Sequence, residues 1–256
     1  MDKRLEEFKR LLDIMDELRA KCPWDKEQTM ESLRHLTIEE TYELADSILE
    51  GKMQDIKKEL GDILLHIVFY AKIGEEQGQF NITDVISSLC EKLIFRHPHV
   101  FGTVEVENTG EVLTNWENLK IKEGNKSILA GVPVSLPALV KAHRIQDKVR
   151  SVGFDWDVRE QIWEKVDEEL SELRHEFENG TPKSMESEFG DLIFSLVNAA
   201  RLYHIDPELA LERTNKKFIR RFNYLEEMTL KKDKPLKEMN LDEMNIYWEE
   251  AKKLDK

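Results

Sequence analysis

Two acidic signatures occur in each half of the chain, at a spacing that could hold a metal ion. Each half contains EExxE, followed about fifteen residues later by ExGD. Side chains three positions apart share one face of a helix, so Glu40 pairs with Glu43, and Glu59 pairs with Asp62. Four converging carboxylates repel one another unless a cation neutralises them. A hard divalent cation such as Mg²⁺ binds carboxylate, water and phosphate oxygens, so the pattern indicates an Mg²⁺ site.

The alternative is that these acids only decorate solvated helix faces, which is common in a chain with 52 Asp and Glu residues. Two observations favour the metal. The quartet recurs at a fixed spacing, and Gly61 and Gly190 lie between the acids. A glycine inside a helix costs about 1 kcal/mol relative to Ala, so its repeated use indicates close approach by another helix or by a ligand. A di-iron site needs Glu-x-x-His on two helices, and only Glu172 with His175 has that spacing.

The two halves are copies of one module. A shift of 129 residues without a gap aligns ten identical pairs. The first copy contributes Glu39, Glu40, Glu43, Leu44, Gly51, Glu59, Gly61, Asp62, Val68 and Ala71, and the second contributes Glu168, Glu169, Glu172, Leu173, Gly180, Glu188, Gly190, Asp191, Val197 and Ala200. Further matches pair Ile14, Asp16 and Arg19 with Ile145, Asp147 and Arg150, and Glu111, Trp116, Glu117 and Lys120 with Glu243, Trp248, Glu249 and Lys252. We therefore expect modules at 1–122 and 138–256, joined by a Gly- and Pro-containing linker at 123–137.

The elements that must position the acids are helical. Apolar residues between Ile38 and Leu49 recur at three- and four-residue steps. Thr37 with Glu40 has capping-box spacing and Gly51 is a plausible stop. A second helix is expected over about 55–71, and Thr181-Pro182 predicts the start of its counterpart. β-hairpin signals are absent from the sequence, so we expect an all-α fold with a bundle of four or five helices in each module.

Composition narrows the class of protein and its partners. The net charge is −14, which disfavours nucleic acid and acidic membranes as partners. The chain has two cysteines, Cys22 and Cys90, and no CxxC, which fits a reducing cytoplasm. The N-terminus has no apolar signal core, and the most apolar run, 63–71, is too short to span a bilayer.

The motifs together resemble the MazG family of nucleoside triphosphate pyrophosphohydrolases, in the all-α superfamily that also holds dimeric dUTPases. The resemblance rests on EExxE and ExGD, on the tandem arrangement, and on the phrases CPWDKEQT (22–29), RHPHVF (96–101) and VGFDW (152–156). It covers nearly the whole chain. It implies hydrolysis of NTPs or dNTPs to monophosphate and pyrophosphate, dependence on Mg²⁺ with Mn²⁺ as a substitute, and a homodimer.

The resemblance also implies roles for individual residues. The metal ligands would be Glu169, Glu172, Glu188 and Asp191 in the second module, and Glu40, Glu43, Glu59 and Asp62 in the first. Phosphate binding is expected from Lys165, Lys217, Arg220 and Arg221, although such basic runs are more often solvated faces. Trp248 is expected at the nucleotide, where it could stack on the base or serve as core. Glu168 could orient or deprotonate the attacking water, or be an ordinary Glu in the first turn of a helix.

The second module is the expected main catalyst. Aligned with Lys216, Lys217, Arg220 and Arg221, the first module has Lys92, Leu93, Arg96 and His97, so two of the four firm cations are missing. Phe95 also replaces the first Arg of the family's usual RRHPHVF. Two other functions stay open at this point: a non-catalytic helical scaffold, and a superfamily relative specialised for dUTP, dCTP or phosphoribosyl-ATP.

Overall fold

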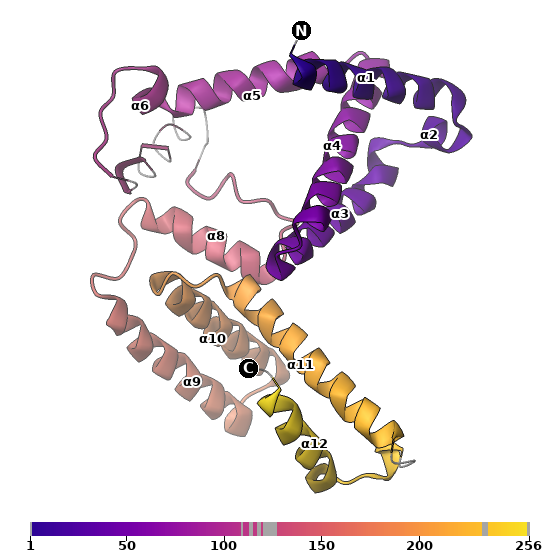
Figure 1. Cartoon of the computed structure of the whole chain (residues 1–256). Helices are drawn as coiled ribbons and strands as arrows, with labels where there is room; N and C mark the ends of the chain where they lie inside the picture. Colours follow the sequence, from indigo (N-terminus) through magenta and orange to yellow (C-terminus); the bar gives the residue numbers. More distant parts are fainter. Residues whose placement is uncertain are drawn as a thin grey trace. The chain divides into compact units, whose positions relative to one another are not determined.

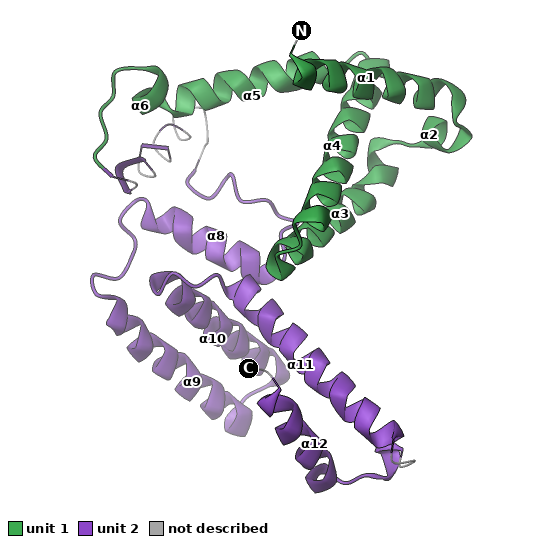
Figure 2. Ribbon diagram, in the orientation of Figure 1, with its two compact units in different colours: residues 1–107 green, residues 108–256 purple. Residues whose placement is uncertain are grey.

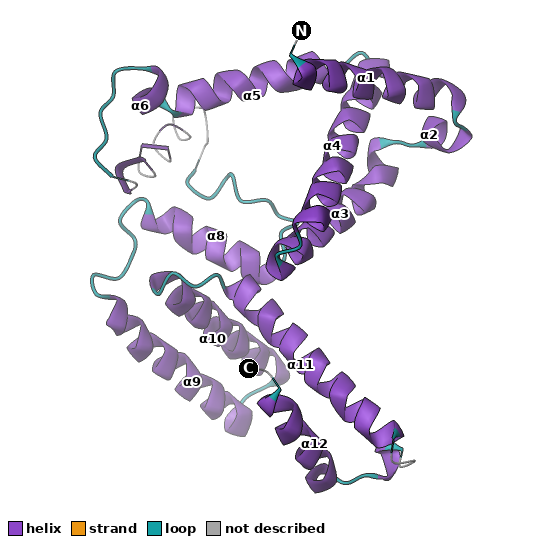
Figure 3. Ribbon diagram, in the orientation of Figure 1, coloured by secondary structure: helices purple, strands orange, loops and turns teal. Residues whose placement is uncertain are grey.

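Helices make up the regular structure of the chain (Figure 1). The computed structural model describes residues 2–108, 110–112, 115–116, 119, 127–231 and 235–254. Within these ranges the chain forms helices and loops but no strand (Figure 3), which confirms the all-α prediction. None of the described helices is both long and apolar enough to pass through a bilayer.

The chain divides into two compact units, residues 1–107 and 108–256 (Figure 2). Each unit contains one EExxE and one ExGD sequence, in agreement with the repeat. Residues 123–126 of the expected linker, together with Glu117 and Lys120 of the repeat, lie outside the described residues. The module boundaries expected from the sequence therefore stay a prediction.

The first unit is built around a pair of long helices. Its elements are α1 (Lys3–Lys21), α2 (Pro23–Glu27), α3 (Met30–Glu50), α4 (Met53–Glu76), α5 (Ile82–Arg96) and α6 (Pro98–Phe101). The helices α3 and α4 pack along each other, and α1 and α5 both contact α4 (Figure 1). The buried core of the unit consists of Met15, Leu33, Val68, Phe69 and Ile73.

The ends of α3 explain how the acids of this unit are brought together. The helix begins at a capping box in which Thr29 and Ser32 bond each other's backbone N–H. The predicted start at Thr37 is therefore wrong, because Thr37 lies inside the helix and its hydroxyl donates to the Leu33 carbonyl, 3.1 Å away. The predicted stop is confirmed: Gly51 has a φ of +67°, the left-handed conformation that glycine adopts without strain. The short turn after it reverses the chain, so that α4 returns along α3.

The second unit repeats this pair. Its elements are α8 (Ala138–Arg150), the 3₁₀ turn η1 (Arg159–Gln161), α9 (Ile162–Asn179), α10 (Pro182–Leu202), α11 (Pro207–Leu230), the 3₁₀ turn η2 (Leu236–Glu238) and α12 (Leu241–Lys253). The helices α9 and α10 form the counterpart of α3 and α4, α8 packs on α10 and α11, and α12 packs on α11. Thr181 caps α10 and Pro182 is its first residue, as predicted. Ile162, Val166 and Ala199 are buried between α9 and α10.

Loss of a core side chain in the first unit tests this packing. Leu33 is 1% exposed, and we expect Leu33→Ala to lower the free energy of unfolding by about 2–5 kcal/mol, through lost burial and the cavity left behind. Urea unfolding followed by circular dichroism measures this loss. Leu5→Ala is the matched control, because Leu5 is 61% exposed and its loss should change stability by no more than about 0.5 kcal/mol. Equal losses in the two variants would contradict the core described here.

Candidate active site

Three carboxylates meet in each unit where the paired helices face each other. In the second unit α9 provides Glu169 and Glu172 and α10 provides Glu188; each offers an oxygen, and these oxygens lie within 4.8 Å of one another. The first unit has the equivalent group from α3 and α4, consisting of Glu40, Glu43 and Glu59. The i, i+3 spacing places two acids on one helix face, and the reversal of the chain brings the third opposite them.

The fourth predicted ligand of each unit lies nearby but outside these groups. Asp62 is 3.8 Å from the Lys58 ammonium, and its charge contributes to the raised pKa of Glu40. Asp191 lines the same cavity as Glu169, and its charge contributes to the raised pKa of Glu188. The structure thus brings three acids of each quartet within reach of one ion and leaves the aspartate at the edge.

The electrostatics of both carboxylate groups favour a bound cation. Loss of hydration raises the pKa of Glu40, and the charges of Asp62, Glu43 and Glu59 raise it further. Glu188 follows the same pattern: loss of hydration raises its pKa, and so do the charges of Glu172 and Asp191. A divalent cation relieves both effects at once, because it neutralises the charges and replaces water as the partner of the oxygens. The donor set, carboxylate oxygens alone, suits a hard cation.

One lysine already compensates part of the charge in each unit. The Lys165 ammonium is 2.8 Å from a Glu169 oxygen and 3.1 Å from a Glu168 oxygen, and these two bonds raise the pKa of Lys165. In the first unit Lys58 is 3.1 Å from Glu59. Lys165 was predicted from the sequence as a site residue, whereas Lys58, which lies next to Glu59 in the sequence and outside the EExxE helix, was not.

The two lysines are not equivalents in the repeat. The position matching Lys165 is Leu36, and the position matching Lys58 is Ser187. Each module has therefore placed a cation at its acids from a different helix, α9 in the second unit and α4 in the first. Glu168 does not lie in the first turn of its helix, because α9 begins at Ile162. Its carboxylate forms an ion pair with Lys165.

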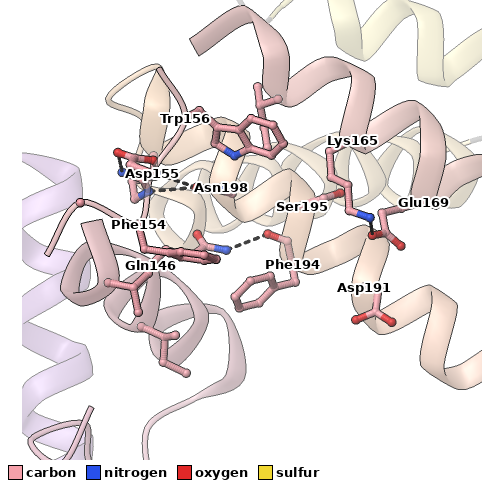
Figure 4. A pocket seen from close by; sticks show the side chains of 15 residues that line it. Gln146, Phe154, Asp155, Trp156, Lys165, Glu169, Asp191, Phe194, Ser195 and Asn198 are labelled. Atoms are coloured by element: carbon pink, nitrogen blue, oxygen red, sulfur yellow. Dashed lines mark hydrogen bonds and ion pairs between the residues drawn. The ribbon is translucent and has the colours of Figure 1, made fainter. Parts of the chain in front are cut away.

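An open cavity of about 530 Å³ adjoins the second carboxylate group (Figure 4). Its walls come from α8, α9, α10 and the segment 153–156. In Figure 4 Lys165, Glu169 and Asp191 lie at one end, and Trp156, Phe154 and Phe194 surround the other. In the first unit a smaller cavity, about 230 Å³, is lined by residues such as Met15, Asp16 and Lys72 rather than by the carboxylate group.

The predicted phosphate-binding residues of α11 lie outside the walls of this cavity, as far as the described residues go. The guanidinium of Arg221 stands over the Trp248 ring, 5.7 Å from its centroid. The Phe218 ring lies against the same indole, with centroids 5.0 Å apart. Lys217 and Arg220 are exposed on α11. Trp248 therefore packs between α11 and α12 in this structure, and its contact with a nucleotide stays a prediction.

The glycines between the acids have open space beside them. A Cβ built on Gly61 or on Gly190 would meet nothing within 4 Å among the described residues. Close approach by another helix of the same unit, one of the two explanations expected from the sequence, is therefore not what requires these glycines. The other explanation, approach by a ligand, stays a prediction.

Removing one acid should separate repulsion from metal binding. We expect Glu188→Gln to raise the melting temperature of the metal-free protein, because it removes one of three mutually repelling charges. The same change should diminish the rise in melting temperature that Mg²⁺ causes, because a ligand is lost. Thermal unfolding in EDTA and in excess Mg²⁺ measures both effects. Glu186→Gln, at an exposed position of α10, is the control; an identical response of both variants would contradict the site.

An ion pair with the buried Arg201 fixes the segment that forms the aromatic wall. Arg201 is 7% exposed, and its Nη1 donates to Asp155 Oδ2 at 3.1 Å. Burial alone would raise the pKa of the Asp155 carboxyl, but the bonds from Arg201 and from the Trp156 backbone outweigh it and hold this pKa below its ordinary value. The pair connects 153–156 to α10.

The ion pair predicts a pH dependence. A carboxyl whose pKa is lowered by folding adds stability above its unfolded pKa and loses this contribution as the pH falls through its folded value. We expect Asp155→Asn to lower the free energy of unfolding by about 2 kcal/mol at neutral pH, and the difference from the wild type to shrink below about pH 4. Urea unfolding at several pH values measures it. Asp157→Asn, exposed two residues further on, should show neither the loss nor the pH dependence.

Comparison with known proteins identifies the family. The family model for the MazG nucleotide pyrophosphohydrolase domain matches residues 28–101 and 159–225, one segment in each unit. A Thermotoga maritima protein named nucleoside triphosphate pyrophosphohydrolase/pyrophosphatase MazG is 44% identical over 250 residues, which are 96% of this chain and 95% of that protein. The nucleoside triphosphate pyrophosphohydrolase of Escherichia coli K12 is 39% identical over 97% of this chain and 98% of its own length. The uncharacterised Bacillus subtilis protein YabN is 46% identical over 98% of this chain and 52% of its own length. The chain belongs to the MazG nucleotide pyrophosphohydrolase family.

Proposed function

We propose that this protein hydrolyses nucleoside triphosphates, ribose or deoxyribose, at the α-phosphorus, and that the second unit is the main catalyst. Water adds to the α-phosphorus and the bond to the bridging oxygen breaks, so the products are a nucleoside monophosphate and pyrophosphate. Membership of the MazG family supports the reaction class. The observation that carries the choice of site is the group Glu169, Glu172 and Glu188 beside a cavity large enough for a nucleoside.

The cation of this site is proposed to be Mg²⁺, with Mn²⁺ as a substitute. The acidic groups of both units could bind a divalent metal, and three carboxylates with room for water and phosphate oxygens match the coordination of Mg²⁺. Bound there, such a cation polarises phosphate oxygens and lowers the pKa of a coordinated water. The proposed ligands are Glu169, Glu172, Glu188 and Asp191 in the second unit, and Glu40, Glu43, Glu59 and Asp62 in the first.

Lys165 and Glu168 are proposed to act next to the ligands. Lys165 forms ion pairs with both Glu168 and Glu169, so it connects a proposed metal ligand to the acid beside it. Glu168 is exposed, so water from solvent can reach its carboxylate. It is proposed to orient this water or to accept its proton as the bond to phosphorus forms.

The basic residues of α11 are proposed to bind the departing pyrophosphate. Lys217, Arg220 and Arg221 add positive charge in a chain whose net charge is −14, and charge-assisted bonds to phosphate oxygens are strong. Because these residues lie outside the described cavity walls, the proposal requires the triphosphate to extend past the acidic end of the cavity. Trp248, in contact with Arg221, is proposed to border the nucleotide there.

A homodimer in the cytoplasm is proposed as the working form. The helix α10 exposes Phe189, Ile193 and Leu196 at 52%, 39% and 45%. These positions recur at three- and four-residue steps, so they form a stripe on one side of the helix, and a second copy would remove this apolar surface from water. The acidic surface supports a substrate that arrives with cations rather than a nucleic-acid partner.

Product analysis in isotopically labelled water tests the reaction and the choice of unit. We expect Mg²⁺-dependent release of pyrophosphate, with the label in the monophosphate, because water attacks the α-phosphorus. Glu172→Gln should lower kcat about 100-fold or more, since loss of even an outer partner of a metal costs 10–100-fold. Glu43→Gln is the matched change in the first unit and should have the smaller effect. Label in the pyrophosphate would contradict the site of attack, and loss of turnover in Glu43→Gln alone would contradict the assignment to the second unit.

A further inference from the structure

A buried amide on α8 has an oxygen that the fold does not use. Gln146 is 3% exposed and lines the cavity of the second unit. Its Nε2 donates to the backbone carbonyl of Phe194 at 2.9 Å. This carbonyl can only accept, so the bond determines which end of the amide faces it. Gln146 Oε1 is then the other end, and it is buried without a hydrogen-bond partner among the described residues. An unsatisfied buried acceptor costs stability.

Other polar side chains that line the cavity have hydrogen-bond partners within the unit. Asn198 Oδ1 accepts from Arg201 Nε at 3.0 Å and from Arg201 Nη2 at 2.7 Å. Arg201 also donates to Asp155, and the Ser195 hydroxyl donates to the Leu192 carbonyl. These groups have partners within the unit. The amide oxygen of Gln146 differs from them because it has no hydrogen-bond partner among the described residues.

The walls around this amide suit a flat aromatic ring. Phe154, Trp156 and Phe194 line the cavity together with Gln146, and in Figure 4 a dashed line joins the Gln146 amide to the backbone carbonyl of Phe194. Aromatic faces stack on nucleobases irrespective of the base. The volume of about 530 Å³ falls within the range of roughly 300–1,000 Å³ that is usual for small-molecule sites.

The two ends of the cavity match the two ends of a nucleotide. The aromatic end contains Gln146, and the opposite end contains Lys165, Glu169 and Asp191 (Figure 4). Glu169 also belongs to the carboxylate group that could hold the cation. A molecule with an aromatic head and an anionic, cation-binding tail is therefore complementary to the cavity along its length.

The first unit shows that the fold does not need this amide. The matches of Ile14 and Asp16 with Ile145 and Asp147 place Met15 at the position of Gln146. Met15 is 1% exposed and belongs to the apolar core of its unit. The same place on the same helix of the repeat therefore accepts an apolar side chain, and a buried polar one in the second unit requires a reason other than packing.

We infer that this cavity holds the nucleobase of the substrate and that Gln146 Oε1 accepts a hydrogen bond from an N–H group on the edge of the base. The inference rests on the proposed function, since it places the reacting phosphate at the acidic end. Gln146 is a specificity-determining residue: it favours bases that present an amino or imino hydrogen over analogues that present none. A site built around such a bond rejects a ligand that lacks it, because the buried acceptor is then left unpaired.

The test compares ATP with purine riboside triphosphate, which lacks the 6-amino group and any N–H on its six-membered ring. We expect the wild type to prefer ATP by about tenfold or more in kcat/KM. Gln146→Met, which installs the residue of the first unit, should reduce this ratio to near one, mainly through a loss with ATP. Gln161→Met, at an exposed position of η1, is the matched control and should keep the wild-type ratio. A ratio unchanged by Gln146→Met would overturn the inference.

Binding of AMP and of purine riboside monophosphate, measured by calorimetry, separates this inference from the proposed function. Turnover of ATP without discrimination between the two bases overturns the inference and leaves the function intact. Absence of turnover, with AMP bound more tightly than the analogue and the preference lost in Gln146→Met, overturns the function and supports the base site. Circular dichroism verifies that the variant is folded, as the apolar residue in the first unit leads us to expect.

Discussion

Each unit has to hold three carboxylates of two facing helices close together, although their charges repel one another, and the rest of the structure depends on this constraint. Their oxygens lie within 4.8 Å of one another, a spacing that like charges oppose. The apolar contacts between the paired helices hold them there. Those contacts are local, between neighbours in sequence joined by a short turn, so a modest core is sufficient to keep the acids in place. Loss of hydration raises the pKa of Glu40 and of Glu188, and the charges of the neighbouring acids raise both pKa values further.

Duplication has preserved this constraint while the surroundings diverged. Both units keep the acids and the glycine between them, but the compensating lysine comes from α4 in one and from α9 in the other. A lysine on either of the paired helices can lie next to the carboxylate group, so the need to compensate the negative charge does not determine which helix provides the lysine. The interiors of the two units also diverged: Met15 belongs to the apolar core of its unit, whereas the equivalent Gln146 lines the cavity that adjoins the carboxylate group.

Periodicity and repetition were sufficient to predict the helices and most of the carboxylate site. Residues three apart must share a helix face, and Gly51 and Thr181 signal a stop and a start through their own backbone chemistry. The prediction failed at Thr37, because its hydroxyl bonds the Leu33 carbonyl inside a helix as readily as it caps one. Contacts between distant segments, such as Gln146 with Phe194 or Asp155 with Arg201, carry no local signal and could not be predicted.

These two distant contacts have opposite consequences, although both connect polar groups to α10. The Asp155–Arg201 pair is complete, since each group has found its charge partner and Asn198 takes up further donors of the arginine. It can therefore act only as a support, holding the aromatic segment in position. The bond from Gln146 to Phe194 is incomplete, because it satisfies the donor end of the amide and orients the acceptor end. The fold fixes the nitrogen end of this amide and leaves its oxygen buried without a partner among the described residues. The oxygen is therefore positioned to accept a hydrogen bond from a bound molecule.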